Sequence, residues 1–290
     1  MLCYISMIIT ISSCSFLFFL VAFSVFLPKE KAVSISLIPT VCLAAFCEHV
    51  IDIYGIIAVF LFCFIAFIYF KKDFQNKIFS YFFLFVFISM VYHFIMHEMP
   101  GFYNPIVLDH VRISQFSSYF SMNINFDKVL CALLIFLTND CIKLTPFISV
   151  NQLKHIAKTS VTCILFMLTP VICSGYVKFD PKIPDITLLW MMNNFLFVCF
   201  SEEIIFRGYI QDRIHKLVNN NPLFSILIAS CIFGLYHINH GIILAVFSAI
   251  CGLFYGYIFY KTNNVWCSIL VHFSLNFCHF ILFTYPNFNL

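Results

Sequence analysis

The amino-acid sequence predicts an all-α protein, a polytopic transmembrane helix bundle with about 8–10 membrane helices. Of its 290 residues, 62% are apolar and only 10% are charged, whereas a soluble globular protein has about 25% charged residues. Apolar runs of about 20 residues, the length that crosses a bilayer as a helix, recur from one end of the chain to the other. This composition excludes a soluble enzyme, a nucleic-acid-binding protein and a disordered tail, and it indicates one integral membrane domain.

The predicted membrane segments follow one another with short connections. In chain order they are Leu2–Leu27, Ala32–Cys47, Ile53–Phe70, Ile78–Met96, Val129–Ile142, Ile156–Val177, Ile186–Phe206, Leu223–Ile238, Ile242–Tyr260 and Val265–Phe283. Two of them, Ala32–Cys47 and Val129–Ile142, are short and are candidates for half-spans or interfacial helices. The first, Leu2–Leu27, exceeds the roughly 7–15-residue core of a cleaved signal peptide and follows no Lys or Arg, which indicates a retained span.

The connections differ in composition and charge. Glu98–Lys128 is the longest polar one and contains Pro100 and Gly101, so we expect it to lie along the membrane interface. Lys and Arg favour cytoplasmic loops, and most of them fall on the same side as the connection Arg207–Pro222. That connection is therefore predicted to be cytoplasmic. Residues 1–180 carry predicted membrane helices without a recognised motif, and residues 181–290 contain the polar groups that follow.

Two adjacent carboxylates, Glu202 and Glu203, stand at the end of the apolar run Ile186–Phe206. Charged groups at membrane depth are costly and usually face a protein interior or a water-filled cavity. Glu203 and Arg207 are four residues apart, so they share a helix face and are expected to pair. Glu202 points about 100° away from that face, which suits a general base. The alternative is that both carboxylates lie among lipid headgroups and bind Arg207 and Lys216.

Later apolar segments contain further polar side chains. His237 follows Phe233 by four residues at the end of Leu223–Ile238, and alone it fits an interfacial histidine. His272 and Asn276 are four residues apart on one face of a predicted helix, where they also fit a helix–helix hydrogen-bond contact. Each position by itself therefore has an ordinary structural explanation.

Together these groups are more specific than any one of them. Metal-free peptide hydrolysis needs a base that deprotonates water, a partner that orients this water, and hydrogen-bond donors for the oxyanion of the tetrahedral intermediate. One carboxylate, two histidines and one asparagine on three predicted helices supply these functions. The sequence therefore predicts a hydrolytic site that contains Glu202, His237, His272 and Asn276.

At these residues the sequence resembles the CPBP family of intramembrane proteases, also called the CAAX-protease or Abi family. The family motifs occur in order as Glu202-Glu203-x-x-x-Arg207, Phe233-x-x-x-His237 and His272-x-x-x-Asn276. The resemblance covers about a third of the chain, from Ile186 to Phe283. Three motifs in order across membrane-type sequence are far more specific than one.

The resemblance implies a glutamate-type intramembrane endopeptidase with its catalytic core in residues 181–290. In such an enzyme Glu202 would activate the water and His237 would hold or polarise it. His272 and Asn276 would stabilise the oxyanion.

The resemblance also implies that Glu203 and Arg207 support the site structurally, and it bears on the cofactor. We expect no metal, because the zinc-protease pattern His-Glu-x-x-His is absent and Asn is an unusual zinc ligand. If the site depended on zinc, its ligands would be Glu202, His237 and His272.

The expected partners are membrane lipids and a membrane-anchored peptide or protein substrate, either lipidated or carrying a sorting signal. No nucleic-acid partner is expected. The expected location is the plasma (inner) membrane of a bacterium. Nothing in the sequence selects one substrate among those of the family.

Two other classes of function compete with the protease interpretation. A non-catalytic membrane scaffold or bacteriocin-immunity-type protein of the same fold would need none of the catalytic residues, so their presence counts against it. A transporter could relay protons through Glu202, Glu203 and Asp140. The absence of repeated halves in the sequence counts against that reading.

The predicted helix boundaries conflict with a shared site. Glu202 lies near the far end of the segment that begins after Asp185, and His237 lies near the far end of the segment that begins after Pro222. Successive segments run in opposite directions through the membrane. At about 1.5 Å per residue, the two side chains would then differ by more than roughly 15 Å in depth. Either Gly208–Pro222 enters the membrane, or the predicted boundaries of the next segment are wrong.

Overall fold

The computed structural model describes residues 17–24, 26–27, 31–72, 76–173, 175 and 177–284. The structure is 73% helical and has almost no sheet, which confirms the predicted all-α class. Within the described part, six helices are long and apolar enough to cross a membrane, and two shorter apolar helices, Lys31–Cys47 and Pro222–Tyr236, accompany them. Most of the predicted first segment, Leu2–Leu27, lies outside the described residues.

The chain forms two compact units. Unit 1 comprises the described residues of Met1–Val107, Met122–Ile142 and Leu196–Ser201, and unit 2 those of Leu108–Ser121, Lys143–Phe195 and Glu202–Leu290. All residues of the three motifs therefore belong to unit 2. The functional division near residue 180 stays a prediction.

Unit 1 is organised around α5 (Phe126–Thr138). All 13 residues of this helix are buried, and α2 (Lys31–Cys47), α3 (Ile53–Lys71) and α4 (Lys77–Ile95) pack against it. At about 1.5 Å per residue, a helix of this length is too short to cross roughly 30 Å of hydrocarbon. The apolar run predicted at Val129–Ile142 is thus a helix enclosed by protein.

Ion pairs connect the ends of three helices in unit 1. Asp140, just after α5, binds Lys71 at the end of α3 and lies 3.6 Å from Lys31 Nζ at the start of α2. The hydrogen bond from Lys71 and the charges of both lysines lower the pKa of the Asp140 carboxyl group. Because the Asp140 side chain is 66% exposed, this is a surface contact of the unit.

The connection Glu98–Lys128 contains an element that the sequence pattern did not predict. β1 (Ile106–Arg112) pairs with β2 (Tyr119–Asn123), and they form the one sheet of the described residues. The Arg112 guanidinium lies 4.9 Å from the centre of the Tyr119 ring. Most side chains of the hairpin are at least partly exposed, so it has no apolar core of its own.

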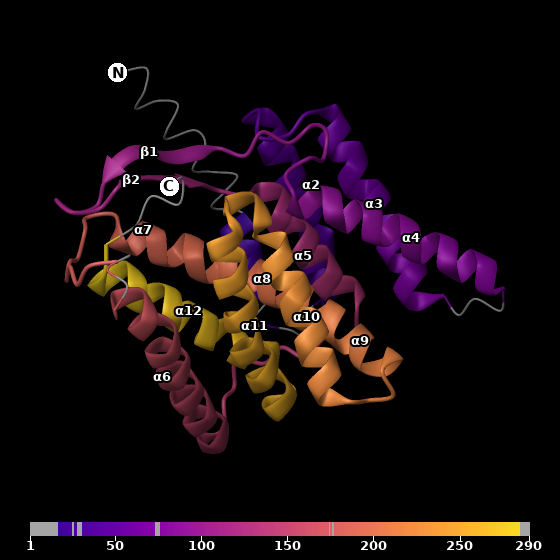
Figure 1. The fold of residues 1–290 in the computed structure, drawn as a ribbon. Coiled ribbons are helices and arrows are strands. Elements are labelled where there is room, and N and C mark those ends of the chain that lie inside the picture. The colour runs from indigo at the N-terminus through magenta and orange to yellow at the C-terminus, as the bar shows by residue number, and fades with distance from the viewer. Residues whose placement is uncertain are drawn as a thin grey trace. The chain divides into compact units, whose positions relative to one another are not determined.

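Unit 2 is a helix bundle that contains the motif residues (Figure 1). Its main elements are α6 (Val150–Cys173), a long helix (Thr187–Leu217, labelled α7 to α9, without its residues Leu196–Ser201), α10 (Pro222–Tyr236), α11 (Ile242–Thr262) and α12 (Val265–Leu282). α10 and α11 lie side by side along their lengths, and α12 packs against both α6 and α11. A short 3₁₀ turn, Ile238–His240, connects α10 to α11.

The long helix corrects one predicted boundary. The predicted segment ended at Phe206, and Arg207–Pro222 was expected to be a cytoplasmic connection. That boundary was wrong, because the helix continues to Leu217. Arg207 is fully buried and Gln211 is 3% exposed, so these polar side chains face protein. Hydropathy along the sequence does not distinguish a polar residue inside a bundle from one in a loop.

Two stretches of the long helix are π-helical, Asn193–Cys199 and Ile204–Gln211. They flank Phe200–Glu203, the short α-helical segment that carries both glutamates. The Ser201 hydroxyl donates a hydrogen bond to the carbonyl of Phe197, within the first π-helical stretch. π-helical turns are rare and occur frequently at functional sites, so the backbone itself marks this position.

A run of asparagines reverses the chain after the long helix. Asn219 and Asn220 have φ values of 54° and 58°, in the left-handed region that Asn adopts more readily than most residues. The Asn221 side chain accepts hydrogen bonds from the first backbone N–H groups of α10, and Pro222 occupies its first turn. A side-chain cap followed by proline is a strong helix-start signal.

This turn resolves the conflict in depth. The stretch from Glu202 to Leu217 has the same length as the stretch from Pro222 to His237, and the turn lies between them. At about 1.5 Å per residue, each side chain is roughly 22 Å from the turn, so they reach a similar level of the bundle. The boundaries of α10 were close to those predicted, and the segment from Gly208 onward continues the helix.

Close packing of α11 depends on two glycines. A Cβ atom at Gly252 would lie 3.0 Å from Ser230 Cβ on α10, and one at Gly256 would lie 2.7 Å from Gln211 Oε1 on the long helix. Gln211 Nε2 also donates a 3.0 Å hydrogen bond to the carbonyl of Gly256. Small residues one turn apart thus bring α11 against both neighbours.

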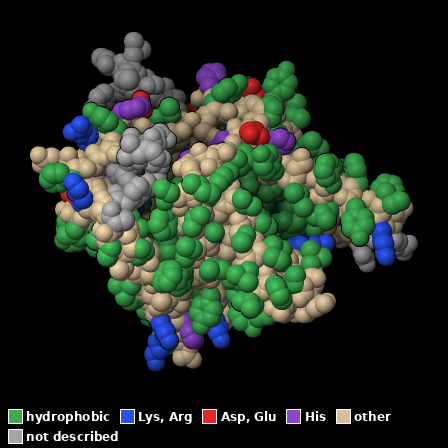
Figure 2. All heavy atoms as spheres, viewed as in Figure 1, with side chains coloured by type: hydrophobic (Ala, Val, Ile, Leu, Met, Phe, Trp, Pro, Cys, Tyr) green, Lys and Arg blue, Asp and Glu red, His purple; other side chains and the backbone are tan. Residues whose placement is uncertain are grey.

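The outward faces of the same helices are apolar. Large hydrophobic side chains are exposed on α10 and α11, among them Leu223, Phe224, Ile242, Val246 and Tyr257. Figure 2 shows hydrophobic side chains over most of the face that these helices present. Such a surface suits contact with lipid chains.

Candidate active site

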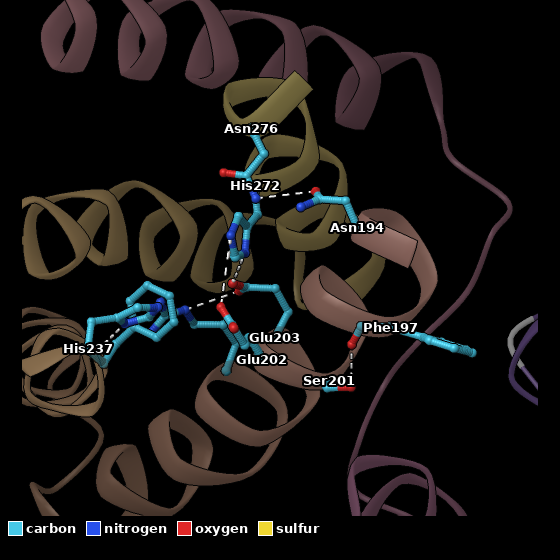
Figure 3. Close-up of polar contacts among 10 residues, drawn as sticks. Asn194, Phe197, Ser201, Glu202, Glu203, His237, His272 and Asn276 are labelled. Carbon is cyan, nitrogen blue, oxygen red and sulfur yellow. Dashed lines mark hydrogen bonds and ion pairs between the residues drawn. The ribbon is translucent and has the colours of Figure 1, made fainter. Parts of the chain in front are cut away.

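Glu203 is the centre of a buried group of ionisable side chains (Figure 3). Its Oε1 lies 3.0 Å from His272 Nδ1 on α12, and its Oε2 accepts a 3.2 Å hydrogen bond from Arg207 Nε. Glu203 and Arg207 are fully buried, and His272 is 5% exposed. Removing charges from water is costly and close pairing offsets that cost, so the three side chains form one electrostatic unit.

Glu202 lies next to this group and is also buried, with 4% of its surface exposed. Its Oε2 is 4.0 Å from His272 Nε2, which is too long for a direct hydrogen bond and short enough for a bridging water. His272 therefore has Glu203 at one ring nitrogen and Glu202 near the other. Lys216, the partner in the headgroup alternative, binds Asp212 at 2.6 Å.

Aromatic rings enclose the group. Tyr255 of α11 stacks on His272, with ring centres 4.5 Å apart and an interplanar angle of 17°. Phe233 of α10 meets the His272 ring edge-on at 6.1 Å. These contacts restrict the orientation of the imidazole and keep its surroundings apolar, which strengthens the electrostatic interactions inside.

Arg207 is held by one carboxylate and two rings. Its Cζ lies 4.9 Å from the centre of Phe233 and 5.8 Å from that of Tyr255. Nη1 and Nη2 are buried and have no hydrogen-bond partner in the part of the chain that the structure describes. A desolvated cation over an aromatic face contributes up to about 2 kcal/mol.

His237 lies at the C-terminal end of α10. Its Nδ1 is 2.9 Å from the carbonyl oxygen of Phe233. A carbonyl only accepts hydrogen bonds, so Nδ1 is the donor, and in the neutral ring Nε2 carries the lone pair. The ring lies edge-on to Phe233 at 4.8 Å. Phe233 therefore packs against both His237 and the His272 ring of the buried group.

Asn276 lies one turn beyond His272 on α12. Its Nδ2 donates a 3.3 Å hydrogen bond to Asn194 Oδ1 on the long helix. In Figure 3, Asn276 and Asn194 lie above the glutamates and His237 lies to their left.

The structure brings all the sequence-predicted site residues into one region of unit 2. Three elements supply them: the long helix gives Glu202, Glu203 and Arg207, α10 gives His237, and α12 gives His272 and Asn276.

Comparison with known families gives this region an identity. Residues 184–278 match the family model described as Rce1-like, type II CAAX prenyl endopeptidase. Over this segment the chain is similar to the CAAX proteases, the family that its sequence motifs resemble. The matched segment covers all of the long helix, all of α10 and α11, and most of α12. No curated protein and no solved structure matches the chain.

The match and the six apolar helices support a broad class: an integral membrane protein similar to a family of proteases, enzymes that act on protein substrates. The sequence resemblance to the CAAX proteases is confirmed on the segment that contains all three motifs.

The arrangement of donors in the CAAX protease site bears on the zinc alternative. A zinc ion would require Glu202, His237 and His272 as joint ligands. Among the described residues, no group of three or more His, Cys, Asp or Glu side chains is placed so that it could hold a metal ion.

Two residues of the site were not singled out from the sequence. Asn194 contacts Asn276, and its signal was the adjacent pair Asn193 and Asn194 inside the apolar run Ile186–Phe206. Tyr255 stacks on a site histidine, and an aromatic residue in an apolar helix gives no comparable signal.

Proposed function

We propose that the protein is an intramembrane endopeptidase that hydrolyses a peptide bond of a membrane-associated substrate with water activated by Glu202. The observation that carries this proposal is the position of His272 between two buried carboxylates, with Nδ1 at Glu203 and Nε2 near Glu202. One carboxylate is paired with Arg207, and the other faces a ring nitrogen at a water-bridging distance. This difference in environment separates a structural carboxylate from a reactive one.

The first step is the activation of water. Glu202 accepts a proton from the water while the water oxygen attacks the carbonyl carbon of the substrate. His237 orients the same water, because its Nδ1 donates to the helix backbone and its Nε2 is the acceptor in the neutral ring.

The second requirement is stabilisation of the oxyanion. Asn276 donates from its amide, and His272 donates from Nε2. Because His272 Nδ1 donates to Glu203, donation from Nε2 requires both ring nitrogens to carry protons. The positive charges of His272 and Arg207 then balance the negative charges of the two glutamates.

The reaction ends with collapse of the tetrahedral intermediate. The C–N bond breaks, and Glu202 returns its proton to the leaving amine, so atoms and charge balance over the cycle. No metal takes part. Glu203 and Arg207 keep the imidazole in place throughout.

The substrate is a membrane-anchored peptide or protein, lipidated or carrying a sorting signal, and membrane lipids surround the protein. We place the protein in the plasma (inner) membrane of a bacterium. The exposed apolar faces of α10 and α11 support a site that substrates approach from within or along the bilayer.

A cleavage assay tests the function. The purified protein in liposomes is incubated with a library of apolar peptides and of peptides with a farnesylated C-terminal Cys-x-x-x sequence, and products are identified by mass spectrometry. We expect cleavage by the wild type and a loss of about 10²–10⁴-fold for Glu202→Gln. A wild type without cleavage of any peptide would favour the non-catalytic scaffold or immunity-type protein. Activity of Glu202→Gln within a few-fold of wild type would overturn the assignment of the base.

A further inference from the structure

The contact between Asn276 and Asn194 joins α12 to the long helix through two side-chain amides. Resting on the proposed function, we propose that Asn194 is a positioning residue that orients the amide of Asn276 toward the oxyanion. It would act through Asn276 and would not touch the substrate.

The contact matters because the two ends of an amide have opposite hydrogen-bonding roles. The terminal torsion of an Asn side chain is broad and nearly two-fold, so a half-turn of the amide exchanges NH₂ and carbonyl oxygen at small cost. With the oxygen turned toward the substrate, Asn276 would repel the developing negative charge. With Asn194 Oδ1 facing Asn276, as in the structure, the contact holds the orientation in which Asn276 Nδ2 is the donor. The same nitrogen carries a second N–H bond, whose direction this contact sets.

The surrounding helices are packed tightly enough to define the distance between the two amides. Trp190 stacks on Phe280, with ring centres 4.1 Å apart and an interplanar angle of 8°. Phe195 meets Phe273 edge-on at 5.0 Å. These aromatic pairs lie before and after the two asparagines on both helices. The amide contact is part-buried between these aromatic pairs, where a hydrogen bond is stronger than in water.

The position on the helix supports the assignment. Asn194 lies in the first π-helical stretch, Asn193–Cys199, which precedes the short α-helical segment that carries Glu202. The same helix thus supplies the base and the acceptor that orients an oxyanion donor. The adjacent Asn193 is buried, with 9% of its surface exposed, and its Oδ1 has no hydrogen-bond partner among the described residues. It provides a matched control one position away.

The experiment separates positioning from packing. Asn194→Leu removes the hydrogen-bond acceptor and keeps a side chain of similar volume, whereas Asn194→Asp keeps an acceptor. Asn193→Leu makes the same change at the adjacent position and is the control. Each variant and the double variant Asn194→Leu with Asn276→Ala are tested for kcat, KM and thermal unfolding. The probe is the best-cleaved library peptide, with a fluorophore and a quencher on either side of the scissile bond.

We expect Asn194→Leu to lower kcat by about tenfold or more with KM nearly unchanged, a smaller loss than the roughly 10²–10³-fold of Asn276→Ala. Asn194→Asp should recover most of the rate, and Asn193→Leu should leave it near wild type. The double variant should be no slower than Asn276→Ala, because Asn194 acts only through that residue.

The outcomes distinguish this inference from the proposed function. A slow Asn276→Ala with a wild-type kcat for Asn194→Leu would overturn the inference and leave the oxyanion role intact. If the fold-loss in kcat of the double variant equals the product of the fold-losses of the two single variants, Asn194 acts independently of Asn276. Wild-type activity of Asn276→Ala would overturn the oxyanion role itself. If Asn194→Leu fails to fold, an Asn194→Asp variant that melts normally but is as slow as Asn276→Ala would refute positioning.

Discussion

Glu203 and His272 are 69 positions apart in the chain, yet Glu203 Oε1 and His272 Nδ1 lie 3.0 Å apart. The contact joins the long helix to α12, and Tyr255 of α11 stacks on the imidazole. The electrostatic environment of the carboxylate pair therefore exists only after three elements have packed together. Variants that disturb this packing should affect stability and activity together.

Arg207→Ala should lower stability as well as activity. It removes the guanidinium that pairs with the buried Glu203 carboxylate, which costs roughly 3–5 kcal/mol. Thermal unfolding in detergent measures the effect. Arg213→Ala, at an exposed position of the same helix, is the control and should melt near wild type. An Arg207→Ala protein with wild-type melting and no activity would make Arg207 part of the reaction.

The enzyme should retain activity in 1,10-phenanthroline. The proposed mechanism contains no metal, because Glu202 activates the water and hydrogen-bond donors stabilise the oxyanion. Cleavage of the library peptide is measured with and without chelator, alongside the metal content of the purified protein. Loss of activity that added zinc restores, together with stoichiometric zinc, would refute the metal-free mechanism.

Gly252→Val should destabilise the protein by about 1–3 kcal/mol, because overpacking a tight helix contact forces neighbours apart. Even a Cβ atom there would lie 3.0 Å from Ser230 Cβ and 3.1 Å from its backbone Cα, neither of which moves easily. Val246→Ile enlarges an exposed side chain of the same helix and should have little effect. Equal unfolding temperatures for the two variants would show that α11 has room to move.

Asp140→Asn should have a small effect that depends on pH. The folded pKa of Asp140 is lowered chiefly by the hydrogen bond from Lys71, so its contribution is present above the unfolded pKa of about 3.9 and disappears as pH falls below it. At 66% exposure the pair is worth about 1 kcal/mol or less. The difference in melting temperature between wild type and variant should be present at pH 7 and shrink as the pH falls through the lowered folded pKa of Asp140. A difference that persists in acid would mean that the Asn substitution acts through something other than charge.

The sequence was most informative where spacing has a direct geometric meaning. Glu203 and Arg207 are one turn apart and form the expected contact, because i and i+4 positions face each other on a helix. The helical class followed from hydropathy for an equally general reason, since only helices satisfy the backbone within each segment. The family resemblance likewise depended on short spacings.

The sequence was least informative about where polar residues lie once helices pack. Arg207 and Gln211 end an apolar run and were assigned to a loop, but they are buried against α10 and α11. The Asn194–Asn276 contact joins residues 82 positions apart, a pairing that no local pattern specifies. The hairpin between Glu98 and Lys128 was missed because its strands have little apolar alternation.

The equal distance of Glu202 and His237 from the asparagine turn limits how this chain can change in length. One residue inserted between Glu202 and Leu217 would rotate Glu202 by about 100° around the helix and carry it away from His272. Residues added between Asn219 and Asn221 would leave both side chains at their level. Insertions and deletions in natural or engineered variants should therefore gather in the turn, and the two helices that adjoin it should keep their lengths.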